Sequence, residues 1–389
     1  MKNTRHITAF YALIQSLYWI TYGLMINFAA AFLLEYGFSN GRIGAILGVS
    51  YALSACAQPL AASVFSRSGL RLSSIMGCVY IVIGLLAALI LVLPVQGGAL
   101  AALVVCTFML QSCMQPSMNS LHRGYELTGV SVNFSFARGM GSAAYSVMCA
   151  LVGQLLRRVS AKILPALYLS TIILLVICLF SFRSPSFAAE REQRRRREPI
   201  LKRYPRFALF LIGLVCLATV HIFIDNFMLQ IMQNLGGGSA EHGTAIAIAG
   251  ITELPAMVFY AWLSRRTDGR NLLRLAGWVW AVKGVLTALS GSPLAIYGTE
   301  LLQFVSYAFY VPATVDYISR TLDPQDFLKG QALSGTAFTL GSLAATFIGG
   351  WLLDAAGVSR ALVIMQIFSI GGAVLFTIAI PRVKKGKAA

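Results

Sequence analysis

Charged residues are scarce in this sequence. Asp, Glu, Lys and Arg together make up 12% of its 389 residues, whereas hydrophobic residues make up 57%. Soluble domains carry about twice that share of charge. So few charges cannot cover a water-exposed surface for a chain of this length. The composition therefore excludes an ordinary soluble protein and predicts that lipid surrounds most of the chain.

Residues typical of metal sites and disulfides are also sparse or badly spaced. The seven cysteines lie inside apolar stretches and form no C-x-x-C pair, and the chain has only four histidines. Small packing residues are the simplest interpretation of such cysteines. We therefore expect no metal site and no cofactor.

Catalytic motifs are missing as well. The connections between apolar stretches are short except at 183–206, which has no His, Cys or Ser/His/Asp grouping, and no phosphate-binding loop occurs. A membrane-bound acyl or glycosyl transferase would need such polar groups at the bilayer surface. A channel would need a repeated filter sequence. We predict that the chain is not an enzyme.

What the sequence does have is long apolar runs. A helix needs about 20 apolar residues to cross a bilayer. The first run, from about 7 to 34, is too long for a signal peptide and predicts an uncleaved span. The predicted fold class is an all-α integral membrane protein of two pseudo-symmetric six-helix bundles. Its twelve spans are expected near 8–34, 42–65, 72–93, 98–121, 136–156, 163–182, 206–234, 243–264, 272–290, 294–319, 329–353 and 360–380.

The basic residues gather on one side of these spans. Of the 31 Lys and Arg residues, 25 fall in loops on one side and 5 on the other. Because positive loops stay in the cytoplasm, this bias places both termini there, in a multi-pass protein of the inner membrane. The net charge of +17 is thus explained by the orientation of the loops across the membrane, and nucleic acid is not expected as a partner.

The two halves of the chain resemble each other. Gln58-Pro59-Leu60 at the end of the second span is matched about half a chain later by Leu254-Pro255-Ala256 at the end of the eighth. A half-length repeat is typical of two bundles around a midplane binding cavity. We predict an N-terminal bundle at 1–182, a basic cytoplasmic linker at 183–205 and a C-terminal bundle at 206–389, in a monomer.

Ionisable residues fall inside several predicted spans. Glu253 and Lys283 lie at similar depth in successive spans, which suggests an ion pair, and His221 and Asp225 share one face of the seventh span. Such groups mark solute or ion pathways, although a pair that only fixes packing is the alternative. With Glu300 in the tenth span, the predicted coupling residues are His221, Asp225, Glu253, Lys283 and Glu300.

The N-terminal half offers polar and aromatic groups instead of carboxylates. Trp19 and Tyr22 lie near mid-depth in the first span, and Arg138 opens the fifth. Stacking of a sugar ring or base on the aromatics is one interpretation, and filling space between helices is the other.

With these residues in place, the sequence resembles the major facilitator superfamily, and within it the lactose permease-like proton symporters. Asn133-Phe134-Ser135-Phe136-Ala137-Arg138 is similar to the start of the family's fifth span, and Thr252-Glu253-Leu254 to part of its eighth. The resemblance implies that Arg138 contacts solute and that Glu253 serves solute and proton. Where the permeases carry glutamates, this chain has Asn119 in the fourth span and Ser306, three residues after Gln303, in the tenth.

The resemblance also implies a cytoplasmic gate. Its loop signature after the second span retains Arg67, but its glycine and aspartate are replaced by Ala62 and Ser66. We expect gate roles for Arg67, Arg71, Arg265 and Asp316, with Asp316 pairing with a nearby arginine such as Arg320.

The sequence therefore predicts a secondary transporter for a small polar organic solute of the sugar or nucleoside class, coupled to protons as a symporter. The predicted solute-binding residues are Trp19, Tyr22, Asn119, Arg138, Glu253 and Gln303. A drug or metabolite efflux antiporter and a carrier for aromatic or other organic acids are the alternatives. The expected partners are the lipid bilayer, the solute and the proton.

Overall fold

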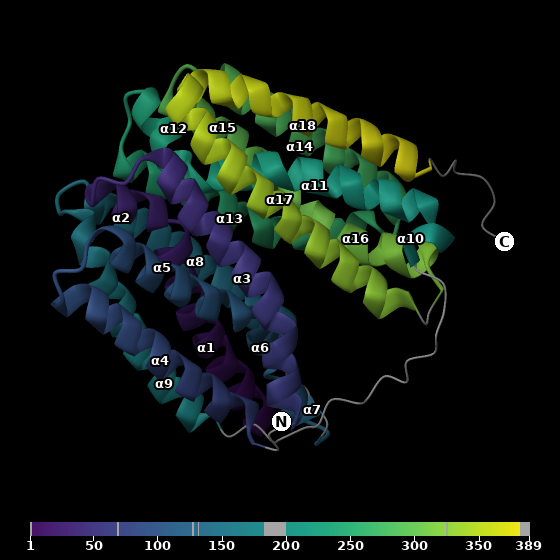
Figure 1. Cartoon of the computed structure of the whole chain (residues 1–389). Coiled ribbons are helices and arrows are strands. Elements are labelled where there is room, and N and C mark those ends of the chain that lie inside the picture. Colours follow the sequence, from purple (N-terminus) through teal and green to yellow (C-terminus); the bar gives the residue numbers. More distant parts are fainter. Residues whose placement is uncertain are drawn as a thin grey trace. The chain divides into compact units, whose positions relative to one another are not determined.

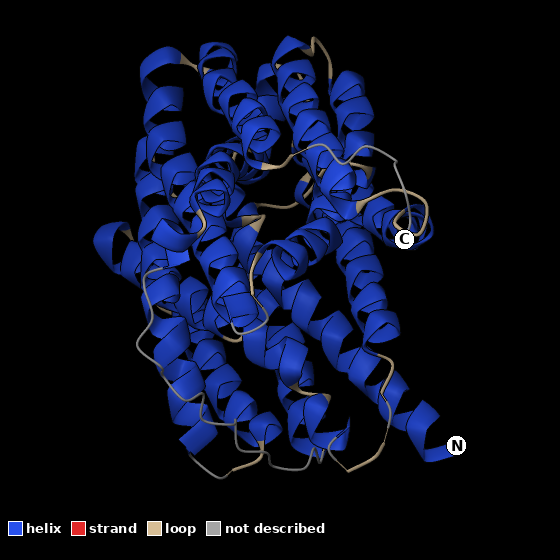
Figure 2. Cartoon of the chain, turned by 90° about the vertical axis from the view of Figure 1, so that its right-hand side faces the viewer, coloured by secondary structure: helices blue, strands red, loops and turns tan. Residues whose placement is uncertain are grey.

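The fold is entirely helical in the residues that the computed structural model describes, which are 2–67, 70–126, 128–130, 132–182, 200–323 and 326–381 (Figure 2). Within them, 11 helical stretches are long and apolar enough to cross a membrane. These stretches match every predicted span except the tenth. The chain is a multi-pass membrane protein.

The chain divides into two compact units, Met1–Gln193 and Arg194–Ala389, with the element order shown in Figure 1. The first unit contains α1 (Lys2–Ile26), α2 (Ala29–Glu35), α3 (Asn40–Arg67), α4 (Leu72–Val92), α5 (Gly97–Cys113), α6 (Gln115–Ser120), α7 (Arg123–Glu126), α8 (Phe134–Leu156), the short 3-10 helix η1 (Ala161–Ile163) and α9 (Leu164–Ser181). The second contains α10 (Ile200–Arg203), α11 (Pro205–Asn226), α12 (Met228–Asn234), α13 (Ser239–Leu263), α14 (Gly269–Leu289), α15 (Pro293–Leu301), η2 (Leu302–Phe304), α16 (Tyr307–Thr321), α17 (Phe327–Ala356) and α18 (Val358–Ala379).

The two units repeat the same sequence of interruptions. In each, a long first helix is broken and continues as a seven-residue helix, α2 or α12. A glycine with positive φ then turns the chain into the next long helix, Gly37 at 75° and Gly236 at 79°. Only glycine adopts this conformation without strain. The shared pattern agrees with the half-length repeat in the sequence.

Helix pairs inside each unit approach closely where glycine removes the side chain. In the first unit α1 packs along α8, and α4 along α9. In the second unit α11 packs along α17 and α18. A Cβ atom on Gly341 of α17 would lie 2.8 Å from the backbone oxygen of Val215 on α11. Small residues let backbones meet in this way when helices associate in lipid.

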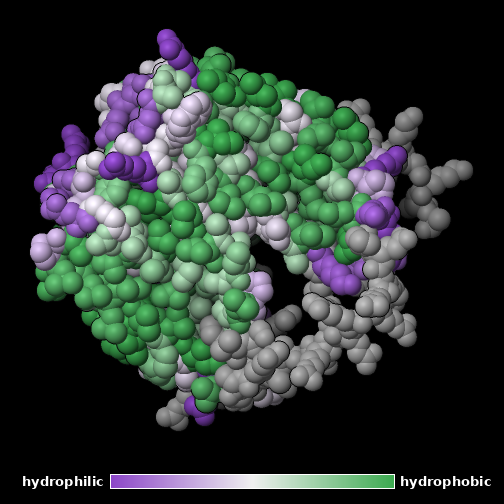
Figure 3. Space-filling model, in the orientation of Figure 1, coloured by the Kyte–Doolittle hydropathy of each residue, from purple (hydrophilic) through white to green (hydrophobic). Residues whose placement is uncertain are grey.

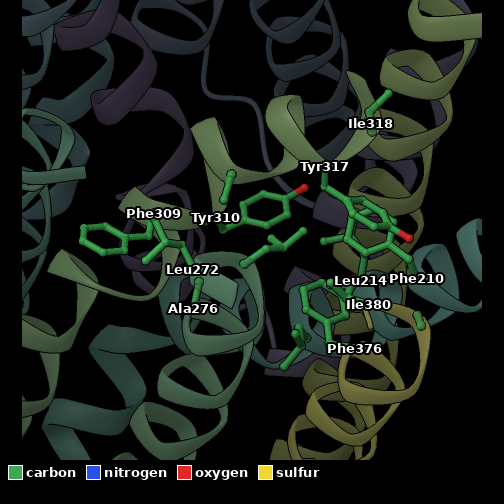
Figure 4. Packing of buried hydrophobic residues seen from close by; sticks show 14 of the residues in the cluster. Phe210, Leu214, Leu272, Ala276, Phe309, Tyr310, Tyr317, Ile318, Phe376 and Ile380 are labelled. Carbon is green, nitrogen blue, oxygen red and sulfur yellow. The ribbon is translucent and has the colours of Figure 1, made fainter. Parts of the chain in front are cut away.

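The interior of the second unit is a cluster of aromatic and aliphatic side chains (Figure 4). Phe210 of α11, Tyr317 of α16 and Phe376 of α18 meet there, with ring centroids about 5 Å apart (Phe210–Tyr317 4.9 Å, Phe210–Phe376 5.0 Å). Large apolar side chains also remain on the outside of the helices, and the visible surface is mainly hydrophobic with polar residues toward the helix ends (Figure 3). Apolar exterior faces of this extent suit contact with lipid.

The predicted tenth span at 294–319 is wrong as a single continuous helix. It forms α15, η2 and α16, none of which is long enough to cross a bilayer alone. The regular hydrogen-bond pattern is interrupted around Ser306, whose φ and ψ are −77° and −92°. The Ser306 hydroxyl donates to the backbone oxygen of Leu302 at 2.9 Å. The same oxygen also accepts from the backbone N–H of Ser306 at 3.0 Å, so the hydroxyl adds a further hydrogen bond to it.

The predicted linker at 183–205 lies largely outside the described residues, which resume at 200. There α10 is a short helix, and α11 follows at Pro205. Arg203 forms ion pairs with Asp323 and with Asp326, the latter at 2.8 Å. These contacts join α10 to the connection between α16 and α17.

Candidate functional site

A buried ion pair occupies the interior of the second unit. The ammonium Nζ of Lys283, on α14, donates to Glu300 Oε2 at 2.7 Å and to Gln303 Oε1 at 3.0 Å. All three residues are at most 4% exposed. Glu300 lies in the last turn of α15 and Gln303 lies in η2, so both partners of the lysine come from the interrupted tenth span.

The predicted ion pair between Lys283 and Glu253 is therefore wrong, because the partner of Lys283 is Glu300. The main packing neighbours of α14 are α11, α15, η2, α16 and α18, and α13, which carries Glu253, is not among them. Glu253 is half-buried on α13, two residues before Pro255. Equal depth in successive spans did not make these two helices neighbours, because the tenth span packs against both of them.

His221 and Asp225 of α11 lie beside this ion pair. Their side chains come within 3.5 Å, as the i,i+4 spacing predicted. His221 is buried, while the Asp225 side chain is 39% exposed. Both residues lie within electrostatic range of Lys283. We call His221, Asp225, Lys283, Glu300 and Gln303 the charged cluster.

Aromatic rings surround the histidine of the charged cluster. The His221 ring lies 5.1 Å from both Trp280 of α14 and Tyr307 of α16, and 6.5 Å from Phe338 of α17. Trp280 and Phe338 are not among the residues predicted from the sequence. The spacing offered a clue for Trp280, because a residue three positions before Lys283 shares its face of the helix. Phe338 had no such sequence relation to the cluster.

A second candidate site lies in the first unit, around Arg138 of α8. Its guanidinium lies over the indole ring of Trp19, with the Cζ atom 3.9 Å from the ring centroid. Its NH1 group donates to the Ser142 hydroxyl at 2.6 Å. A cation on an aromatic face is held electrostatically by the ring. Gly141 makes room for this stack, since a Cβ there would approach Trp19 Cδ1 to 2.6 Å.

A chain of hydrogen bonds fixes Trp19 from the other side. Its Nε1 donates to Gln15 Oε1 at 3.2 Å, and Gln15 Nε2 donates to the Tyr11 hydroxyl at 2.7 Å. Tyr11 in turn donates to the backbone oxygen of Met118 at 2.9 Å. We call Arg138, Trp19, Ser142 and Gln15 the arginine site.

The structure places Tyr22 and Asn119 close to the arginine site. The Tyr22 ring lies 5.1 Å from Trp19 on the same helix. Asn119, in α6, follows Met118, whose backbone oxygen accepts from Tyr11. The predicted solute-binding residues of the first unit are thus gathered in one region, whereas Glu253 and Gln303 belong to the second unit.

The predicted gate residues lie at helix ends. Asp316 Oδ1 accepts from Arg320 Nε at 2.8 Å, which confirms the predicted pairing. Arg71 is the residue that precedes α4, and Arg265 is exposed after α13. The side chain of Arg67 lies outside the described part of the chain.

One further polar contact supports the start of α14. Asp268 accepts hydrogen bonds from the backbone N–H and the guanidinium of Arg270, and these bonds hold the pKa of the Asp268 carboxyl below its usual range. The Asp316 carboxylate lies directly against Gly269, where a Cβ would leave it no room. Two carboxylates therefore meet the N-terminus of α14, where helix backbone N–H groups favour negative charge.

No group of three His, Cys, Asp or Glu side chains is close enough to hold a metal ion in the described part of the chain. The two sites contain hydrogen-bond donors and acceptors and aromatic faces, and the charged cluster also contains a buried ion pair. Such groups are suited to binding a polar organic molecule and to changing charge with a proton.

Comparison with known proteins agrees with this fold. The profile of the MFS_1 like family matches residues 9–363. A maltose permease of Geobacillus stearothermophilus is 24% identical over 379 residues, covering 94% of this chain and 93% of the relative. The uncharacterized transporter YwbF of Bacillus subtilis is 23% identical over 284 residues, covering 69% of this chain and 68% of the relative.

Solved structures of similar fold cover nearly the whole chain. A mutant of the nucleoside transporter NupG has a TM-score of 0.83 at 12% identity, covering 96% of this chain and 100% of that structure. An inward-facing bacterial homologue of the human lysosomal transporter Spinster has a TM-score of 0.71 at 13% identity, covering 97% and 96%. At such identities the likeness concerns the fold alone. Because the family profile spans most of the sequence, this chain belongs to the MFS_1 like family and is a major facilitator transporter.

Proposed function

We propose that this protein is a proton-coupled symporter that carries a small polar organic solute of the sugar or nucleoside class. It acts by alternating access, so that a solute site opens first to one side of the membrane and then to the other. It moves its solute chemically unchanged and is a carrier rather than an enzyme.

The charged cluster is the observation that carries this proposal. Burying Lys283 and Glu300 removes both charges from water, and well-packed apolar residues of similar volume would serve stability equally well. Ionisable groups retained inside membrane helices mark ion and solute pathways. Asp225 lies within electrostatic range of both Lys283 and Glu300 and is the most exposed member of the charged cluster, so its charge affects the pair.

A proton on one carboxylate would change the balance of the cluster. With Lys283 paired to Glu300, loss of the Asp225 charge leaves the lysine held by one carboxylate instead of two. A ligand shifts a conformational equilibrium by its differential affinity for the two states, and the proton acts as such a ligand here. Glu253 on α13 is a further carboxylate, and the resemblance implies that it binds both the solute and the proton.

The relatives support the solute class. One relative is a maltose permease, and one protein of similar fold is a nucleoside transporter. Both names describe neutral, hydroxyl-rich molecules about the size of one or two sugar rings. Trp19 and Tyr22 provide aromatic faces for stacking such a ring, and Gln303 and Asn119 are amides of the kind that bind hydroxyl groups.

The proposed orientation in the membrane follows from the distribution of charge. The bias of Lys and Arg toward one set of loops places both termini in the cytoplasm and the protein in the inner membrane. We propose that it works as a monomer, with lipid, solute and proton as its partners and without nucleic acid.

The test is uptake into proteoliposomes. Counterflow with sugars, nucleosides and aromatic acids identifies a solute, and its accumulation is then measured with and without an inward proton gradient. We expect accumulation only with the gradient. Glu253→Gln and Asp225→Asn should each abolish accumulation but retain counterflow, because counterflow needs no net proton movement.

The matched control is Asp354→Asn, which changes an exposed carboxylate near the end of α17. It should accumulate solute as the unmodified protein does. Accumulation that persists after the proton gradient is collapsed would remove the proton from the mechanism.

A further inference from the structure

We infer that the transported solute carries a negatively charged group, a carboxylate or a phosphate, and that Arg138 binds it. This inference rests on the proposed transport of a polar organic solute, but not on proton coupling. Within the sugar or nucleoside class, it assigns the solute to the acidic derivatives.

The guanidinium of Arg138 is held in place with most of its donors unused. Trp19 covers one face, and Ser142 accepts from NH1. No described residue accepts a hydrogen bond from Nε or NH2 of this arginine. The guanidinium presents its donors as a planar fork that matches the two oxygens of a carboxylate or phosphate. The stack on Trp19 fixes the plane of that fork before any ligand arrives.

In the described part of the first unit, Arg138 has no counter-charge. Residues 1–182 contain only two acidic residues, Glu35 and Glu126. Glu35 is the last residue of α2 and accepts from Ser160 at 2.9 Å, and Glu126 ends α7, outside the candidate spans. Among the described side chains of the first unit, Arg138 contacts Trp19 and Ser142, and no carboxylate lies within 4.0 Å of it.

Lys283, a buried cation of the second unit, has different surroundings. Lys283 has Glu300 at 2.7 Å and Gln303 at 3.0 Å. Arg138 is partly buried, and because an unpaired charge shielded from water is costly, a partner stabilises a cation in this setting. The chain supplies that partner for Lys283 and leaves it to the solute for Arg138.

Charge at one end of the first unit adds an independent argument. Four exposed basic residues lie where α3 begins and where α8 and η1 meet, with Glu35 as the acidic residue beside them: Arg42, Arg157, Arg158 and Lys162. These side chains interrupt the bias of basic residues toward the opposite loops. A basic surface raises the local concentration of anions and speeds their binding in a salt-dependent way.

The test compares probes that differ only in the acidic group. Full-length protein in proteoliposomes is assayed by counterflow with D-glucose against D-glucuronate and with uridine against uridine 5′-monophosphate. The first pair tests a carboxylate and the second a phosphate. We expect the acidic member of at least one pair to be preferred about 10- to 100-fold, the range expected for hydrogen bonds to a charged group.

Two substitutions at Ser142 then test the role of Arg138 directly. Ser142→Asp places a carboxylate next to the arginine, so it should lower counterflow of the acidic probe more than that of the neutral one and abolish the preference. Ser142→Asn differs from Ser142→Asp in lacking the charge, and it should retain more of the preference than Ser142→Asp does. Arg138→Gln should lose it, while Arg138→Lys keeps a reduced one.

The outcomes separate this inference from the proposed function. Equal or better counterflow of the neutral probes, with the same preference in Ser142→Asp and Ser142→Asn, overturns the inference and leaves sugar or nucleoside transport standing. If neither these four probes nor any other sugar or nucleoside of the wider screen supports counterflow, the proposed function itself is contradicted, and the inference falls with it.

Discussion

At the scale of single residues, the two embedded cations have different surroundings. Lys283 lies in an ion pair that is almost wholly shielded from solvent, whereas Arg138 lies on an indole ring with a hydroxyl as its hydrogen-bond partner. A lysine is a compact charge that a single carboxylate neutralises, while an arginine is a planar fork suited to a two-oxygen ligand. The choice of residue thus agrees with an internal role for Lys283 and a ligand-binding role for Arg138.

The ion pair gives a prediction that separates stability from transport. Lys283→Met leaves Glu300 as an unpaired buried charge and should lower the free energy of unfolding by about 3–5 kcal/mol. Glu300→Gln should destabilise in the same sense by leaving the lysine unpaired. The double substitution Lys283→Met with Glu300→Leu removes both charges and should melt close to the unmodified protein, as measured by thermal unfolding in detergent.

Transport by the double variant decides what the pair is for. If the pair takes part in coupling, the stable double variant should lose gradient-driven accumulation. Normal accumulation by this variant would assign the pair to packing alone.

Prediction of the site from sequence worked where partners lie on one helix. His221 and Asp225 were paired by their i,i+4 spacing, and Asp316 and Arg320 are separated by the same interval. It failed for Lys283, because its partner lies on a different helix. The distance between two helices depends on how all of them pack, which no local spacing encodes.

At the scale of elements, interrupted helices are a recurring feature. The first helix of each unit is broken before its end, and the predicted tenth span is divided into α15, η2 and α16. The interruption in the tenth span brings Glu300 and Gln303 to Lys283. Apolar content and length identified these stretches as spans but not where they bend, since a break depends on which neighbours satisfy the exposed backbone groups.

Close packing of α11 against α17 gives a prediction at this scale. Gly341→Ala would place a methyl group 2.6 Å from Ala218 Cβ and 2.8 Å from the Val215 backbone oxygen. Backbone atoms cannot move aside as a flexible side chain does. We expect a loss of about 1–3 kcal/mol in the free energy of unfolding, typical of overpacking, read as a lower melting temperature in detergent.

The control lies on the same helix. A Cβ on Gly335 of α17 meets no atom within 4 Å. Gly335→Ala should therefore leave the melting temperature unchanged or raise it slightly, because alanine has less conformational freedom to lose on folding. Equal melting of both variants would mean that α11 and α17 do not pack as closely as described.

At the scale of the whole molecule, charge distribution determines how the chain lies in the membrane. With 31 Lys and Arg against 14 Asp and Glu, the chain has enough basic residues to fix the orientation of its loops. In the predicted topology, the basic linker between the halves adds to the side that carries the termini.

Reporter fusions test this orientation. Fluorescent protein fused to the C-terminus should fluoresce, because it folds in the cytoplasm, and alkaline phosphatase at the same position should be inactive. The reciprocal control is a fusion after Gly237, in the connection between α12 and α13, which should give active phosphatase. The opposite pattern at both positions would invert the predicted topology.

The sequence by itself determined that this is a helical membrane protein, which stretches are its spans, and which spans carry charged residues. Hydrophobic length, charge bias and residue spacing along one helix are local properties, so they can be read directly from the order of residues. Only the tertiary structure decided that Lys283 pairs with Glu300, that Trp280 and Phe338 surround His221, and that Arg138 lies on Trp19. Each of these contacts joins different helices, and their approach depends on the packing of a whole unit.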